Sequence, residues 1–84
     1  MKNKILIKVY VPSLDNFYEI FIPTNESVKK VMDLIIKTVG DLSDNSLPND
    51  RKYNLFNPET SSFYNNSSII RDTDIKNGKN LVIV

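Results

Sequence analysis

The stretch "ESVKKVMDLIIKTVG", from Glu26 to Gly40, decides the fold of this chain. Its apolar residues recur every three or four positions, which is typical of an amphipathic helix with one buried face. The buried face is predicted to comprise Val28, Val31, Met32, Ile35 and Val39. Thr24 or Asn25 is expected to cap the first turn, and Gly40 is expected to end the helix.

Two short segments before this helix have the alternating pattern of β-strands. The first has its apolar face at Ile5, Ile7, Val9 and Val11. The turn-forming residues Pro12 to Asn16 separate it from a second strand, Phe17 to Ile22. In that second strand the side chains predicted to point inward are Tyr18, Ile20 and Ile22. The two strands are therefore expected to form a hairpin.

A long polar connection, Asp41 to Lys52, follows the helix, and its expected anchors in the core are Leu42 and Leu47. Leu34 lies off the buried face of the helix and is expected to pack under this connection. A third strand is predicted at Tyr53 to Asn57, with Tyr53 and Leu55 pointing inward and Phe56 outward.

The rest of the chain is predicted to return to the sheet. A short edge strand is expected at Phe63 and Tyr64, followed by a tight turn in which Ile70 and Ile75 fill the core. Asp72 and Asp74 are expected to cap that turn by accepting hydrogen bonds from the backbone. Asn77-Gly78 then reverses the chain into a closing strand, which is expected to lie parallel to the first strand.

These elements predict one α+β domain over residues 1–84: a mixed sheet of four to five strands, with one long helix on one face. Eighty-four residues provide too little chain for a second core.

Composition argues against several classes of function. The net charge of +1 disfavours nucleic-acid binding, which usually needs a basic surface. The chain has no cysteine and no histidine, so the commonest catalytic bases and metal ligands are missing. The acidic segment with Asp41, Asp44 and Asp50 lacks the glycine and glutamate of a calcium-binding EF-hand loop. We therefore expect a protein that is not an enzyme and has no cofactor or metal site.

The start of the chain and its hydropathy bear on location. No apolar run approaches the roughly 20 residues of a membrane span. The segment "MKNKILIKVYV" resembles a strand more than a signal peptide. A cytoplasmic protein without direct membrane insertion is expected.

The stretches "IPTNESVKKVMDLI" and "RDTDIKNGKNLVIV" resemble ubiquitin in their order and pattern, and the resemblance extends over nearly the whole chain. This implies a β-grasp, or ubiquitin-like, roll. "VKKVMDLI" and "DTDIKNGKNLVIV" are more narrowly similar to the YukD/EsaB family, the small ubiquitin-like proteins of Firmicute type VII (WXG-type) secretion systems. That resemblance implies an accessory or regulatory role, and a location in the cytoplasm or at the periphery of the membrane secretion complex.

The end of the sequence distinguishes two roles of ubiquitin-like proteins. A protein modifier or sulfur carrier presents a flexible Gly-Gly tail, whereas this sequence ends in the apolar residues Leu81 to Val84. A non-conjugated docking module is therefore expected. A modifier or sulfur carrier made from a longer precursor is kept as an alternative.

The side of the sheet away from the helix is the candidate protein-binding surface, because large exposed apolar patches often mark interaction sites. Alternation along the strands places several apolar residues there, and the ubiquitin resemblance implies Leu14, Phe56 and Val84 as contact positions. The full candidate set is Leu6, Tyr10, Leu14, Phe17, Phe21, Phe56, Val82 and Val84.

The expected partner is a protein, implied by the resemblance to be a type VII secretion component. Two alternatives use the same surface: a homodimer formed through the outer face, and a single-stranded RNA-binding domain that stacks bases on its aromatic residues. Lys29, Lys30 and Lys37 are expected to lie on the solvated side of the helix.

Overall fold

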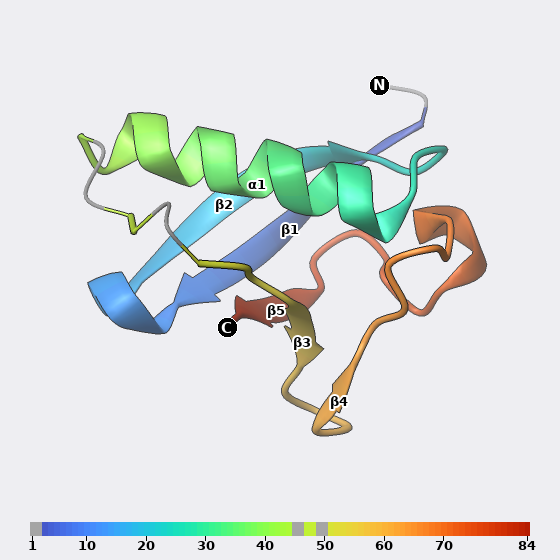
Figure 1. Ribbon diagram of the computed structural model, residues 1–84. Helices are drawn as coiled ribbons and strands as arrows, with labels where there is room; N and C mark the ends of the chain where they lie inside the picture. Colours follow the sequence, from blue (N-terminus) through green and yellow to red (C-terminus); the bar gives the residue numbers. More distant parts are fainter. Residues whose placement is uncertain (1–2, 45–46, 49–50) are drawn as a thin grey trace.

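The computed structural model describes residues 3–44, 47–48 and 51–84 (Figure 1). In chain order the elements are β1 (Lys4–Val11), the 3-10 turn η1 (Pro12–Leu14), β2 (Asn16–Pro23), α1 (Val28–Leu42), β3 (Leu55–Asn57), β4 (Ser62–Phe63), the 3-10 turn η2 (Ile70–Asp72) and β5 (Asn80–Ile83). Asp50, considered above as a calcium ligand, lies outside the described residues. No helix within these ranges has both the length and the apolar character that crossing a membrane requires.

The strands form one mixed sheet in the order β2-β1-β5-β3-β4. β1 and β2 make the expected antiparallel hairpin, with Lys4 opposite Pro23 and Val11 opposite Asn16. β5 lies parallel to β1, as predicted, and it is antiparallel to β3. The mixed five-stranded sheet with one helix on one face confirms the predicted architecture.

The core lies between α1 and one face of the sheet, and α1 runs across that face in Figure 1. All five apolar helix residues predicted to be buried are buried, at 3% exposure or less. Alternate strand residues cover them from below: Ile7, Val9, Val11, Ile20, Ile22, Leu55, Leu81 and Ile83. Ile5, Tyr18 and Tyr53 are half-buried and pack against this cluster from its margin.

The start of α1 differs from the prediction. Ser27 caps the helix, and its Oγ accepts a hydrogen bond from the Lys30 backbone N–H at 3.2 Å. The predicted caps, Thr24 and Asn25, precede it in a turn whose carbonyl groups are used elsewhere: the Thr24 and Glu26 oxygens accept from Arg71 and Ile70. The helix starts later because residues 24–26 pair with the η2 segment.

The end of α1 also differs. Gly40 is an ordinary helical residue, and the helix continues to Leu42 with Ser43 as its C-cap. The left-handed residue that often follows a helix is Asp44, with φ of 54°. Since the helix continues, Leu42 lies on its last turn, 61% exposed, and the prediction that it anchors the connection is wrong. Leu34 is exposed as well, whereas Leu47 is buried as predicted.

The return segment agrees with the prediction in its buried residues and differs in its bounds. Ile70 and Ile75 are buried as expected. Gly78 has φ of +86°, which glycine adopts without strain, in the turn that leads into β5. Beyond β5, the Val84 backbone exchanges two hydrogen bonds with Asn54, of 2.7 and 3.0 Å. β3 is shorter than predicted, and β4 begins one residue earlier.

A polar network joins β3 to the segment before β5, and the two aspartates predicted to cap the η2 turn do not form that cap. Thr73 does so instead: its Oγ1 donates to the Ile70 carbonyl and accepts from the Ile75 N–H. The Asp74 carboxylate accepts hydrogen bonds from the Tyr64 hydroxyl at 2.6 Å and the Asn57 amide at 3.1 Å. Lys79 Nζ lies 3.8 Å from the same carboxylate. Burial of the ring, and then the hydrogen bond to Asp74, raises the pKa of Tyr64.

Replacing the observed helix cap tests the start of α1. Ser27→Ala removes the acceptor of the Lys30 N–H and should lower the free energy of unfolding by about 0.5–2 kcal/mol. Asn25→Ala is the matched control and should change it by less than about 0.5 kcal/mol. Urea unfolding of the two variants measures both values. A larger loss in Asn25→Ala than in Ser27→Ala would contradict the assignment.

The Tyr64–Asp74 contact predicts a specific response to alkaline pH. Because the fold favours the neutral phenol, the stability from this contact is fully present below about pH 10 and is lost as the pH rises above it. Tyr64→Phe should cost about 1 kcal/mol at neutral pH, and the difference from the wild type should shrink above about pH 10. Urea unfolding at a series of pH values measures it, with Tyr18→Phe as the control. A difference that stays constant across this range would refute the prediction.

Candidate functional site

The strand register brings five side chains into one line across the face of the sheet opposite α1. Tyr10 pairs with Phe17 on β2 and with Val82 on β5. Val82 in turn lies opposite Phe56, and Phe56 lies opposite Phe63 on the short edge strand β4. Directly paired residues point to the same face, so the line crosses all five strands. We call this set the aromatic row: Phe17, Tyr10, Val82, Phe56 and Phe63.

The two ends of the aromatic row are aromatic pairs. The ring centroids of Tyr10 and Phe17 are 4.8 Å apart, and those of Phe56 and Phe63 are 5.1 Å apart with an edge-on tilt. Both distances lie in the range where aromatic rings attract each other beyond simple burial. The two outermost rings are nonetheless largely in solvent, with Phe17 56% and Phe63 60% exposed. The row therefore offers apolar area that the fold itself leaves uncovered.

The Tyr10 ring is held in place by the turn after β1. Its hydroxyl donates a 2.7 Å hydrogen bond to Asp15 Oδ1. Asp15 can reach it because its backbone is left-handed, with φ of 47°, directly after η1. This hydrogen bond to a carboxylate raises the pKa of Tyr10 above its ordinary value of 10.0, so the hydroxyl is neutral at physiological pH. Because this hydrogen bond already restrains the Tyr10 ring, the ring loses less conformational entropy when a partner covers it.

Polar and apolar neighbours border the aromatic row along β1 and β2. Lys8 and Glu19 pair across the two strands on the same face, and the Lys8 ammonium lies 5.0 Å from the centre of the Phe17 ring. This is within reach of a cation–π attraction. Beyond them, Leu6 pairs with Phe21, which is 52% exposed. The face thus combines apolar rings with charged side chains, which include Lys4, Lys8 and Glu19.

The structure brings most of the predicted site residues to this face. Six share it by register: Leu6, Tyr10, Phe17, Phe21, Phe56 and Val82. Val84 follows β5 and is 44% exposed beside them. Leu14 is different, because it lies in η1, is half-buried and packs against the core. We therefore leave it out of the surface considered below.

Sequence reasoning missed Phe63 and Lys8 as members of the site. Phe63 precedes Tyr64 in a polar loop, and nothing in the local pattern distinguishes which of the two rings joins the outer face. The pairing of Phe56 with Phe63 decides it: Phe63 extends the aromatic row, whereas Tyr64 is half-buried and bonds Asp74. The sequence did offer one signal for Phe63, since the edge strand predicted at Phe63 and Tyr64 contains aromatic residues that could pair with Phe56.

The side chains of this face are suited to recognition by contact. Its side chains are aromatic and aliphatic, with Lys8 and Glu19 between them. Within residues 3–44, 47–48 and 51–84, no three acidic, histidine or cysteine side chains gather closely enough to hold a metal ion. Burying an aromatic or large aliphatic side chain against a partner contributes about 1.5–3 kcal/mol.

Comparisons with known proteins identify the fold. No protein-family model and no curated protein sequence matches this chain. Among solved structures, a chain of the MycP5-free ESX-5 inner membrane complex superposes with a TM-score of 0.79 at 14% identity, over 98% of this chain and 21% of that one. This chain thus spans about a fifth of that larger chain.

Two ubiquitin-like domains also superpose on this chain. The ubiquitin-like domain of the Mycobacterium tuberculosis type VII secretion system protein ECCD1 has a TM-score of 0.68 at 10% identity, over 94% of this chain and 97% of that one. The N-terminal ubiquitin-like domain of the 4931431F19Rik protein also has a TM-score of 0.68, at 19% identity, over 100% of this chain and 76% of that one. At these identities the likeness concerns the fold, and the chain has the ubiquitin-like β-grasp fold.

Proposed function

We propose that this chain is a non-enzymatic, non-conjugated protein-binding module that serves a type VII secretion apparatus in an accessory or regulatory role. Its contact surface is the aromatic row together with Leu6, Phe21 and Val84. Its partner is a protein of the secretion machine, and the chain associates with the membrane-embedded complex from its periphery. A relationship to the YukD/EsaB family belongs to the same proposal.

The observation that carries the proposal is the exposed, ordered row of apolar side chains on an otherwise complete fold. Aromatic residues dominate the energetics of many protein interfaces. Here the rings of the pairs Tyr10–Phe17 and Phe56–Phe63 already contact each other within the chain, and Asp15 accepts a hydrogen bond from the Tyr10 hydroxyl. A partner that covers the row would gain apolar burial without first ordering these rings.

The choice of a secretion component is supported by the solved structures. One of the similar chains is the ubiquitin-like domain of the type VII secretion system protein ECCD1, and another is part of an ESX-5 inner membrane complex. In the second case a domain of this shape is part of a larger membrane assembly. A domain of this shape is suited to contacts within such an assembly.

RNA is a weaker candidate for the same surface. Base stacking could use the exposed rings, but phosphates need cations beside them. On this face the register places Lys4 and Lys8, of which Lys8 is directly opposite Glu19, and the chain as a whole has a net charge of +1. These charges favour a protein partner.

Charge substitutions in the aromatic row test the proposal. Phe56→Asp and Phe17→Asp put a carboxylate where the partner should cover a ring, and each should reduce capture of type VII subunits at least roughly tenfold. The matched control is Lys37→Asp on the exposed side of α1. The measurement is affinity capture with the tagged chain in cells that carry a type VII system, with the subunits identified by mass spectrometry.

Two further measurements make this result interpretable. Circular dichroism and thermal melting establish that each variant is folded. Sedimentation of the purified chain shows whether the same face joins two copies, in which case both Phe variants would shift a dimer to the monomer. Capture of secretion subunits that is equal in Phe56→Asp, Phe17→Asp and Lys37→Asp would refute the aromatic row as the contact surface.

A further inference from the structure

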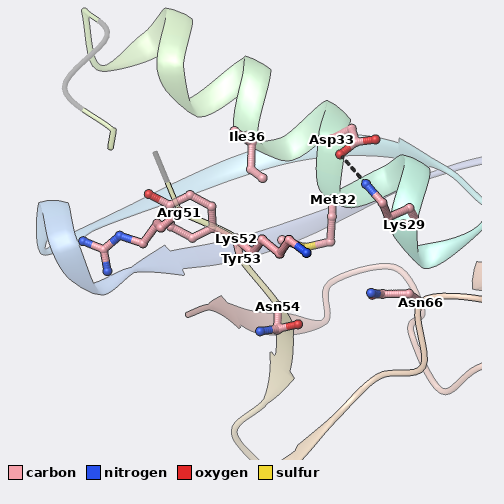
Figure 2. Close-up of a pocket in the computed structure, with 9 residues that line it drawn as sticks. All are labelled: Lys29, Met32, Asp33, Ile36, Arg51, Lys52, Tyr53, Asn54 and Asn66. Carbon is pink, nitrogen blue, oxygen red and sulfur yellow. Dashed lines mark hydrogen bonds and ion pairs between the residues drawn. The ribbon is translucent and has the colours of Figure 1, made fainter. Parts of the chain in front are cut away.

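A groove lies on the helix side of the molecule, between α1 and residues 51–54, the segment that leads into β3. Figure 2 shows its lining side chains. It has a volume of about 300 Å³. Met32 and Ile36 point from α1 toward residues 51–54 and make its apolar floor, with Met32 buried and Ile36 half-buried. The aromatic row lies on the other face of the sheet, so the two surfaces are separate.

The charged lining of this groove is mainly cationic. The charged lining residues are Lys29, Arg51, Lys52 and one carboxylate, Asp33. Asp33 Oδ1 is already 3.3 Å from Lys29 Nζ, so its charge is compensated within the helix. The Arg51 guanidinium lies 5.8 Å from the Tyr53 ring centre and is directed away from the other lining side chains in Figure 2. In the part of the chain that the structure describes, Lys52 makes no ion pair.

The attraction for anions comes from these side chains, since the first backbone groups of α1 are already satisfied. The Val28 N–H donates to the Ser68 carbonyl at 2.8 Å, and the Lys29 N–H donates to the Asn66 carbonyl at 3.1 Å. Asn54 and Asn66 also line the groove, and the side-chain amide of an asparagine can donate or accept hydrogen bonds. The groove therefore combines a lysine that makes no ion pair with the described residues, polar side chains and an apolar floor.

We propose that this groove binds an acidic segment of a partner protein. A carboxylate of the segment pairs with Lys52, and an aliphatic side chain next to it packs on Ile36 and the edge of Met32. Opposite charges at an interface favour encounter and reject partners of like charge. A protein segment fits better than a small anion, because an inorganic ion would leave the apolar floor uncovered.

This inference goes beyond the proposed function, because it gives the chain a second contact on the opposite side of the sheet. A partner on the aromatic row does not cover Lys52 or Ile36. The chain could then hold two protein segments at once, which raises the effective concentration of each for the other.

The experiment uses the full chain, labelled with nitrogen-15, and a short synthetic peptide of alternating glutamate and leucine. We expect saturable NMR shifts at the amides of Asn54, Asn66 and Ile36, with an affinity that falls as salt is added. Lys52→Glu should weaken binding at least roughly fivefold, since it replaces an attraction with a repulsion. Lys37→Glu, on the same helix outside the groove, is the matched control and should have little effect.

Three further comparisons separate the possible causes. Phe56→Asp should leave peptide binding unchanged, so that failure of this inference and failure of the aromatic row are distinguishable. A peptide with glutamine in place of glutamate should bind much more weakly. Equal weakening of peptide binding by Lys52→Glu and Lys37→Glu would overturn the inference. So would inorganic phosphate if it produced the same saturable shifts as the peptide. An absence of saturable shifts with the peptide would overturn it as well.

Discussion

The structure depends on a single packing contact: the apolar side of α1 against one face of the sheet. Val28, Val31, Met32, Ile35 and Val39 meet alternate residues of the strands, and together they account for most of the core. A sheet has two faces, and one helix can cover only one of them. The period-two alternation that sends Ile7 and Val9 to the helix sends Tyr10 and its neighbours to the other side. The core and the exposed aromatic row therefore follow from the same alternation.

The arrangement also explains why the outer surface is ordered. The inner face fixes the register of every strand, because a slip by one residue would exchange buried and exposed side chains. With the register fixed, Phe17, Tyr10 and Val82 must lie in line, and Phe56 and Phe63 continue it. The packing of the inner face thus maintains the geometry of the aromatic row on the opposite face of the sheet. The groove beside Lys52 depends on α1 as well, since Met32 contributes to both core and groove.

Much of this could be predicted from the sequence, because periodicity reports directly on burial. The helix, the hairpin and nearly all buried residues follow from spacing, and the parallel placement of β5 beside β1 follows from the order of the elements. The error at the helix start comes from competition between distant segments for backbone groups. Thr24 and Asn25 are good caps locally, yet pairing of residues 24–26 with the η2 segment moves the helix start to Ser27. Phe63 and Lys52 acquire their surroundings only from strand pairing and loop placement, which no local pattern encodes.

The central claim is that α1 covers one face of the sheet and leaves the aromatic row in solvent. Paramagnetic relaxation by a soluble gadolinium chelate measures this directly, through NMR signals of individual side chains. The account predicts strong broadening of the Phe17 and Phe63 ring signals, and protection of the Ile7, Ile35 and Leu81 methyl groups. Protection of Phe17 and Phe63 at the level of Ile35, in a chain that sediments as a monomer, would contradict it.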